Sequence, residues 1–165
     1  MLLTAPSSPQ VVSRQTLVVL DSSVDDLSLL LADLSHAKAL VLDPSRDGVE
    51  QITQALQIHG SVSNLHIVSH GGPGYVQLGD TRLGVETLNH YASQLETWAA
   101  ALQGQDLLLY GCQVAQGALG QLFLQQLQQL TGANLAASNE KVGRINGQAR
   151  WNLDARRGDV QTPLA

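Results

Sequence analysis

Short apolar runs alternate with amphipathic stretches along most of this chain. Continuous apolar runs of strand length predict buried strands at residues 16–20, 39–42, 65–69, 106–110 and 133–137. Between them, apolar residues recur at helical spacing and predict helices at residues 24–34, 49–57, 85–102 and 119–130. The residues of the last helix that are expected to face the core are Leu119, Leu122, Phe123, Leu127 and Leu130. Strands and helices in alternation predict an α/β fold with three layers, a mainly parallel sheet of about five to six strands with helices on both faces.

The chain behaves differently after the third strand. Gly71-Gly72-Pro73-Gly74 cannot begin a helix, and the runs at 75–78 and 81–83, joined by Gly79-Asp80, predict a small β-hairpin. A polar loop is expected at 138–147 and a last short strand at 151–153. The domain organisation predicted is a flexible leader at 1–15, one α/β domain at 16–155 and a polar tail at 156–165.

Composition narrows the class of protein. The 165 residues are 44% hydrophobic and 14% charged, which is typical of one globular domain with a proper core. A net charge of -5 gives a nucleic-acid partner little electrostatic support. No apolar run approaches the roughly 18 residues of a membrane span, and residues 1–10 show no secretory signal. A single cysteine means that the fold needs no disulfide, so the compartment stays open.

Two residues able to do chemistry stand at the ends of apolar runs. His70 follows the third predicted strand, and Cys112, the chain's one cysteine, follows the fourth. If these strands are neighbours in a parallel sheet, both side chains emerge at its carboxyl edge, where open α/β sheets place their sites. Each residue taken alone has an ordinary alternative as part of the core.

Metal and phosphate chemistry are poorly supported. His66 and His70 lie four residues apart in a strand, which separates them by roughly 13 Å, so they cannot share one ion. The chain has no glycine-rich phosphate-binding loop. The acidic segment 43–48 lacks the ligand spacing of an EF-hand and is interpreted as a turn. We therefore predict no cofactor and no metal.

Nucleophilic catalysis fits the order of the residues better. A cysteine needs a nearby base or cation to become a thiolate near neutral pH, and histidine is the usual one. Every histidine precedes Cys112. This order excludes papain-like peptidases and the α/β-hydrolase arrangement, in which the nucleophile comes before its base.

An apolar strand ending in Ser69-His70-Gly71, a hairpin, a helix and an apolar strand ending in Gly111-Cys112 resemble the caspase, gingipain and legumain clan of cysteine peptidases. The 42 residues from His70 to Cys112 (112 minus 70) are close to the about 50 typical of caspases. The resemblance implies a caspase-like sandwich, with Cys112 as nucleophile and His70 as proton-transfer partner. It also implies an oxyanion hole formed by the backbone N–H groups of Gly71 and Cys112.

The chain from about residue 16 to 154 also resembles a bacterial family catalogued as a domain of unknown function, the 4347 type. Four segments carry the likeness: Val19-Leu20-Asp21-Ser22-Ser23-Val24-Asp25-Asp26, Leu42-Asp43-Pro44-Ser45-Arg46-Asp47-Gly48-Val49-Glu50-Gln51-Ile52, His66-Ile67-Val68-Ser69-His70-Gly71 and Leu109-Tyr110-Gly111-Cys112. The family occurs near the N-termini of very large surface or secreted repeat proteins. The resemblance thus implies export or a cell-surface location, and a polypeptide substrate such as the parent chain or a co-secreted protein.

Substrate-binding residues follow only from the clan resemblance. In clan relatives with basic specificity, an acidic group near the end of the first strand lines the substrate pocket, and Asp21 occupies the matching place. Ser69 and the loop carboxylate Glu140 are further candidates. Asp21 has an equally good explanation as the cap of the following helix. Two functions therefore stay open: a cysteine peptidase with a Cys-His dyad, or a catalytically inactive docking or targeting module of a large surface protein.

Overall fold

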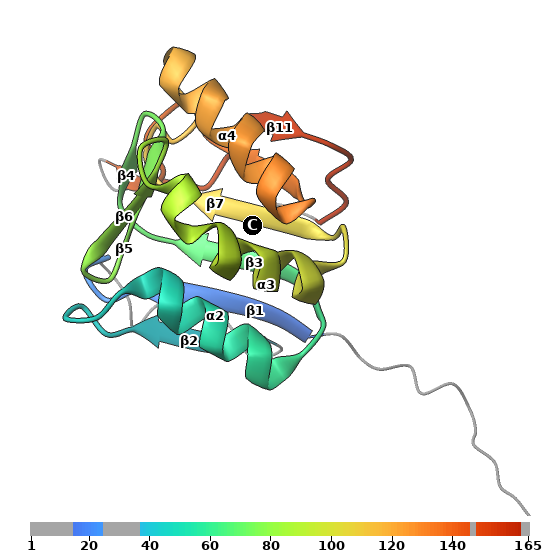
Figure 1. The fold of residues 1–165 in the computed structure, drawn as a ribbon. Coiled ribbons are helices and arrows are strands. Elements are labelled where there is room, and N and C mark those ends of the chain that lie inside the picture. The colour runs from blue at the N-terminus through green and yellow to red at the C-terminus, as the bar shows by residue number, and fades with distance from the viewer. Residues whose placement is uncertain (1–14, 25–36, 146–147, 163–165) are drawn as a thin grey trace, which may run out of the picture.

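Six strands form the central sheet of the described residues, in the order β11-β8-β7-β3-β1-β2 (Figure 1). The structure is a computed structural model that describes residues 15–24, 37–145 and 148–162. The strands of the sheet are β1 (Gln15–Asp21), β2 (Lys38–Leu42), β3 (Val62–Val68), β7 (Asp106–Tyr110), β8 (Asn134–Ala137) and β11 (Ala155–Arg157). Neighbouring strands are parallel except β11, which runs antiparallel to β8. The predicted mainly parallel sheet is therefore confirmed.

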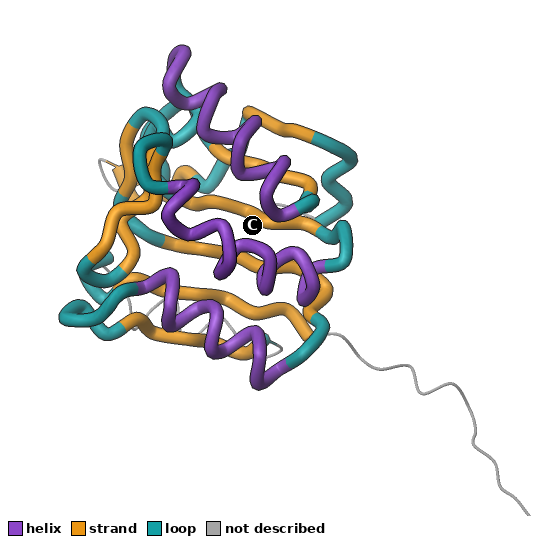
Figure 2. The backbone as a smooth tube through the Cα atoms, viewed as in Figure 1, coloured by secondary structure: helices purple, strands orange, loops and turns teal. Residues whose placement is uncertain are grey.

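Three helices cover one face of this sheet in the described part of the chain (Figures 1 and 2). They are α2 (Gly48–His59), α3 (Ala92–Leu102) and α4 (Gly117–Thr131). Trp98 of α3 and Phe123 of α4 are fully buried in the same core as Leu65 and Ile67 of β3. Along each strand, alternate side chains point to the opposite face of the sheet. There Leu108 and Tyr110 of β7 belong to a second, smaller core cluster. The helix predicted at 24–34 falls almost entirely outside the described residues.

The segment before α3 differs from the prediction of one long helix at 85–102. It contains a turn and a short 3₁₀ helix, η1 (Leu88–Tyr91), and the α-helix begins only at Ala92. The Thr87 hydroxyl accepts a hydrogen bond from the N–H of Gly84 at 2.9 Å and donates one to the carbonyl of Arg82 at 2.8 Å. Such local side-chain bonds offer the backbone an alternative to the helix, which explains the late start.

The core-facing side of α4 is partly as predicted, since Phe123 and Leu127 are buried and Leu130 packs against the core. Leu119 is 56% and Leu122 39% exposed, so the expectation that both face the core was wrong. Gly120 lies directly against the backbone of Ala115, where a Cβ atom would not fit. Gly120 is itself buried, together with Phe123, Leu124 and Leu127, and the two leucines lie at the surface.

A small antiparallel ribbon stands at the ends of the parallel strands. It consists of β4 (Gly71–Gly72), β5 (Tyr75–Leu78) and β6 (Thr81–Gly84), and its tip turns at Gly79, whose φ is 62°. The hairpin predicted after the third strand is thereby confirmed. In Figure 1 the arrows of β3 and β7 end on the side of this ribbon, which places it at the carboxyl edge of the sheet.

The C-terminal part departs most from the sequence prediction. A second hairpin, β9 (Gly143–Ile145) with β10 (Gln148–Arg150), occurs where the loop at 138–147 was expected. The strand predicted at 151–153 was wrong, and the edge strand is β11 instead. In the segment just before β11, Leu153 is buried and the Asp154 carboxylate accepts hydrogen bonds from the backbone N–H and the side chain of Asn139.

The last described residues are attached to the central sheet by hydrogen bonds. The predicted polar tail begins inside β11, and Thr162 near its end is hydrogen-bonded to the buried Asp106 carboxylate. Within the described ranges, no helix is long and apolar enough to cross a membrane.

Candidate functional site

His70 and Cys112 follow two neighbouring parallel strands at equal distances. The register of β3 and β7 pairs Val68 with Tyr110, so each candidate lies two residues beyond a paired position. The N–H of Ser69 donates to the Tyr110 carbonyl at 3.2 Å and extends the contact past the strand ends. Both residues therefore lie in the segments that directly follow two neighbouring parallel strands, at the carboxyl edge of the sheet. The two strands are neighbours, as the sequence analysis required, and the pairing of His70 with Cys112 stays a prediction.

The imidazole of His70 is held by a backbone carbonyl. Its Nε2 atom lies 3.0 Å from the carbonyl oxygen of Ser23, which follows β1. The backbone of His70 is held as well, since its own carbonyl accepts from the N–H of Gln77 at 2.8 Å. The side chain is exposed. The backbone and the ring of His70 are therefore both held by hydrogen bonds, while the residue stays exposed to solvent.

The thiol of Cys112 is half-buried and contacts the loop after β8. Its Sγ atom lies 3.5 Å from the carbonyl oxygen of Val142 and 3.4 Å from the N–H nitrogen of the same residue. The loop is tied to the Cys112 segment by two further bonds, from Gln113 N–H to the Glu140 carbonyl and from Ala115 N–H to the Ser138 carbonyl. In the described part of the chain, no hydrogen bond joins His70 directly to Cys112. Each of the two residues pairs with a backbone group instead.

Glycines bring the two segments into direct contact. A Cβ atom on Gly71 would lie 2.8 Å from Val114 Cγ2, 2.9 Å from the Tyr75 carbonyl oxygen and 3.6 Å from the Cys112 carbonyl oxygen. The backbone at Gly111 is similarly close to Ser69 and Gly71. Gly71 therefore lies beside Cys112, as an oxyanion hole shared between them requires, and that role stays a prediction.

The three candidate substrate residues lie in different environments. Asp21 is 2% exposed and accepts three hydrogen bonds: Ser23 donates two to Oδ1 and Gly79 donates one to Oδ2. Ser69 is buried, and its hydroxyl has no hydrogen-bond partner among the described residues. Glu140 is exposed on the loop that contacts Cys112. Of the two carboxylates, only that of Glu140 is open to a ligand in this structure.

The remaining histidine of β3 belongs to the packing. His66 stacks on Tyr110 with ring centroids 5.8 Å apart and an angle of 7° between the rings. Burial lowers the pKa of His66, against an opposing effect of the Asp106 carboxylate. A neutral imidazole in a stacked position is consistent with a structural role. Among the described residues no group of three or more His, Cys, Asp or Glu could hold a metal ion.

The two residues that hold the candidate pair were not predicted. Ser23 and Val142 act through their backbone carbonyl and N–H groups. Backbone groups are the same in every residue, so the sequence contains no signal for them. Only the glycine-rich turn at Gly71 indicated that two segments of the chain approach each other closely here.

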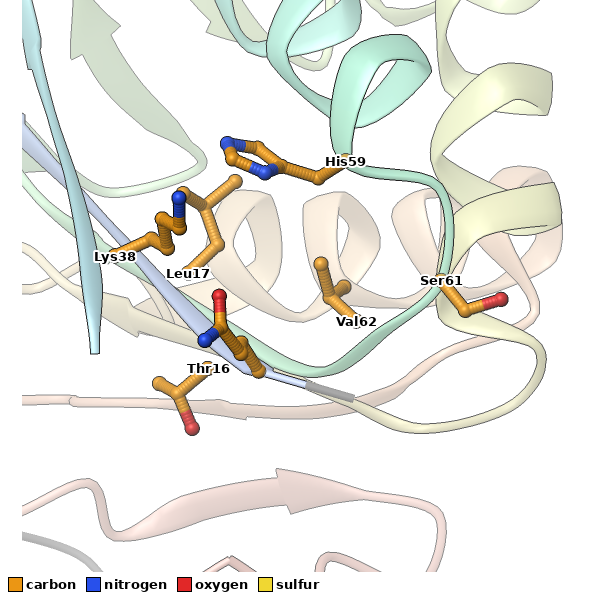
Figure 3. A pocket seen from close by; sticks show the side chains of 7 residues that line it. Thr16, Leu17, Lys38, His59, Ser61 and Val62 are labelled. Atoms are coloured by element: carbon orange, nitrogen blue, oxygen red, sulfur yellow. The ribbon is translucent and has the colours of Figure 1, made fainter. Parts of the chain in front are cut away.

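A small cavity lies at the other edge of the sheet. It has a volume of about 130 Å³ and is lined by the starts of β1, β2 and β3 and the end of α2, including Lys38, His59 and Ser61 (Figure 3). Ligand pockets are usually roughly 300–1,000 Å³, so this space is too small for a peptide. It lies far along the strands from His70, at the amino edge.

Fold and geometry together define an α/β protein with a histidine and a cysteine at the carboxyl edge of a mainly parallel sheet. The chain belongs to the family described as a domain of unknown function, DUF4347, whose model matches residues 17–165. The resemblance to this family that the sequence showed is thus confirmed. No curated protein sequence matches the chain.

Among solved structures, the chain is similar to caspase-1 from Spodoptera frugiperda, with 14% identity and a TM-score of 0.39. The match covers 84% of this chain and 65% of that one. The structure of pro-sf-caspase-1 is similar at 18% identity and a TM-score of 0.33, covering 61% of this chain and 52% of that one. The chain thus spans less than two thirds of the length of either.

Proposed function

We propose that this domain is a cysteine peptidase in which Cys112 and His70 form the catalytic pair. The observation that carries the proposal is the register of β3 and β7, which sets both residues two positions beyond a paired residue at one edge of the sheet. The hydrogen bond from the His70 ring to the Ser23 carbonyl supports it, since a positioned imidazole is what a thiol nucleophile needs.

The chemistry is acyl transfer. His70 takes the proton of the Cys112 thiol through the ring nitrogen that faces away from Ser23, and Sγ attacks the carbonyl carbon of the peptide bond. The N–H groups of Gly71 and Cys112 stabilise the oxyanion that forms. His70 then returns the proton to the departing amine as the C–N bond breaks and leaves a thioester. Water, deprotonated by His70, hydrolyses the thioester and releases the acid and the free thiol.

The loop that contacts the thiol must give way to substrate. The Val142 N–H and carbonyl groups are backbone groups, like those that an extended peptide presents. A substrate main chain can replace them at the sulfur at little cost, because hydrogen bonds that involve sulfur are weak. The substrate class in this proposal is a polypeptide, in the parent chain or in a co-secreted protein.

A preference for Arg or Lys before the cleaved bond is part of the proposal. Glu140 supports it, because this exposed carboxylate lies on the loop bonded to the Cys112 segment. A charge-assisted pair with a guanidinium or ammonium group would give such a preference. Replacing Glu140 with Gln removes the charge and keeps the size. The test is whether the cleavage rates of basic and neutral peptides then become equal.

The decisive experiment compares the wild-type domain with Cys112→Ala and His70→Ala on a peptide library and with a thiol-directed reagent. His59→Ala is the matched control, because His59 is also exposed but lies at the opposite edge of the sheet. We expect cleavage that both variants abolish and the control retains. Labelling of Cys112 no faster than that of a free thiol, with no cleavage dependent on both residues, would refute the proposal.

One observation favours the other function, a catalytically inactive docking module of a larger surface protein. The two backbone contacts from Val142 cover the Cys112 sulfur in this structure. A module of that kind would bind its partner equally well as wild type and as Cys112→Ala. The same set of variants therefore separates the two functions.

A further inference from the structure

The turn after β1 is built by the buried Asp21 carboxylate. Its Oδ1 atom accepts from the Ser23 N–H at 2.9 Å and from the Ser23 hydroxyl at 2.6 Å. The Asp21 carbonyl also accepts from the N–H of Val24 at 3.1 Å. These bonds fix the Ser23 peptide relative to the end of the strand, and the carbonyl of Ser23 is the group that meets the His70 ring.

The same carboxylate reaches the ribbon that holds the His70 backbone. Asp21 Oδ2 accepts from the N–H of Gly79 at the ribbon tip, at 2.9 Å. Two residues earlier in the ribbon, the N–H of Gln77 donates to the His70 carbonyl at 2.8 Å. One oxygen of Asp21 therefore fixes the partner of the His70 ring, and the other fixes the strand that binds the His70 backbone.

The bond to Ser23 decides which nitrogen of His70 holds the proton. A carbonyl oxygen only accepts, so Nε2 must be protonated to make the 3.0 Å contact. In the neutral ring, Nδ1 then keeps its lone pair. A base that is to take the proton of a thiol needs this unprotonated nitrogen.

We propose that Asp21 is a positioning residue that sets the orientation and tautomer of His70 through Ser23 and the ribbon. This inference rests on the proposed peptidase function. It gives the first-strand carboxylate a role other than pairing with a substrate cation. Because Asp21 is 2% exposed and both its oxygens accept hydrogen bonds, a cation could reach it only if the turn opened.

Neutralising and truncating Asp21 separate these two roles. In Asp21→Asn the amide oxygen can still accept both bonds from Ser23, while the charge and the bond from the Gly79 N–H are lost, because the amide nitrogen cannot accept. In Asp21→Ala the turn loses all three bonds. A positioning role predicts that the alanine variant is affected far more than the asparagine variant. A cation-binding role predicts that both lose any preference for Arg or Lys equally.

A neighbouring turn provides the matched control. Asp43, directly after β2, accepts from the Ser45 N–H at 2.9 Å and from the Ser45 hydroxyl at 2.7 Å through Oδ1. These are the same two bonds over the same spacing of two residues, at an exposed position. Asp43→Ala removes an equivalent turn whose backbone lies against the ribbon tip at Gly79, but it touches neither His70 nor the groups that bind it, Ser23 and Gln77.

The primary measurement is the tautomer of His70, read from its ring ¹⁵N shifts in the labelled protein at alkaline pH, where imidazole rings are neutral. We expect protonation at Nε2 in the wild type, in Asp21→Asn and in Asp43→Ala, and a mixture of tautomers in Asp21→Ala. In cleavage assays, Asp21→Ala should lower kcat about 10- to 100-fold with little change in KM, the loss typical of a misplaced catalytic group.

Clear outcomes overturn the inference. Protonation at Nδ1 in the wild type contradicts it at once, as does an unchanged tautomer in folded Asp21→Ala. If Asp21→Ala does not fold, Ser23→Ala replaces it, since it removes only the 2.6 Å hydroxyl bond. This variant should shift the tautomer less, in the same direction, and no shift contradicts the inference. The tautomer is measured without turnover, so a wild type that cleaves nothing refutes the peptidase function alone.

Discussion

The hydroxyl of Tyr91 is the best place to test how the ribbon is attached to the rest of the domain. It donates to Asp47 Oδ2 at 2.7 Å and lies 2.9 Å from the hydroxyl of Thr81 in β6. The other oxygen of Asp47 accepts from Val49 and Glu50 N–H groups and caps α2. Tyr91→Phe removes the link between helix and ribbon and leaves the helix cap in place.

The size of the effect follows from the bonds lost. A hydrogen bond to a charged group is worth about 1.5–3 kcal/mol, and phenylalanine fills the same space, so no cavity opens. We expect Tyr91→Phe to lower the free energy of unfolding by about 2 kcal/mol. For a chain of this size each kcal/mol shifts Tm by about 2–4 °C, so Tm should fall by roughly 4–8 °C.

Tyr75→Phe is the control, because it makes the same chemical change in the same ribbon. Within the described residues the Tyr75 hydroxyl has no hydrogen-bond partner, and surface changes of this kind usually stay within about 0.5 kcal/mol. Thermal unfolding of both variants, with hydrogen exchange of the β5 and β6 amides, provides the measurement. Equal Tm values for the two variants would show that the Tyr91 link contributes nothing to stability.

The contribution of Tyr91 also has a predicted pH dependence. Burial raises the pKa of its hydroxyl above the usual 10.0, and the Asp47 carboxylate adds to this while the hydrogen bond from Thr81 opposes it. The native state therefore holds this proton more tightly than the unfolded state. The stability gained is complete below pH 10 and is lost as the pH rises through the native pKa. The difference between wild type and Tyr91→Phe should shrink accordingly.

Two further predictions concern the ends of the strands. Asp106 is buried, which raises its pKa, but hydrogen bonds from Thr162, Gln161 and Asn134 outweigh this and hold the pKa below the usual 3.8. The stabilisation that the Asp106 carboxylate provides is thus present above pH 3.8 and is lost as the pH falls through the lower pKa of the native state. Urea unfolding between about pH 5 and about pH 2.5 should show a smaller loss for Asp106→Asn than for the wild type, and equal losses would contradict this. Gly71→Ala should cost about 1–3 kcal/mol in thermal unfolding, because its Cβ atom would meet Val114 at 2.8 Å; an unchanged Tm would show that the loop yields freely.

Much of the sheet could be predicted from the sequence because buried parallel strands are continuous apolar runs. The bounds of β7 are those predicted, at Asp106–Tyr110. Errors occur where local polar bonds or close backbone contacts override the apolar pattern. Thr87 delays the start of α3, and at the start of α4 it is Gly120, packed against Ala115, that is buried while Leu119 is exposed.

The alternation of strands and helices up to β8, and the place of His70 and Cys112 at strand ends, could be inferred from the sequence because they follow from short-range patterns of side chains. That β3 and β7 are neighbours, in a register that aligns the two residues, is visible only in the folded chain. It alone also shows that Ser23 and Val142 hold them and that Asp21 is buried beneath the Ser23 turn. The sequence carries no signal for these contacts because the groups that meet His70, Cys112 and Asp21 include backbone groups, which all residues share, and several of the contacts join segments far apart in the chain.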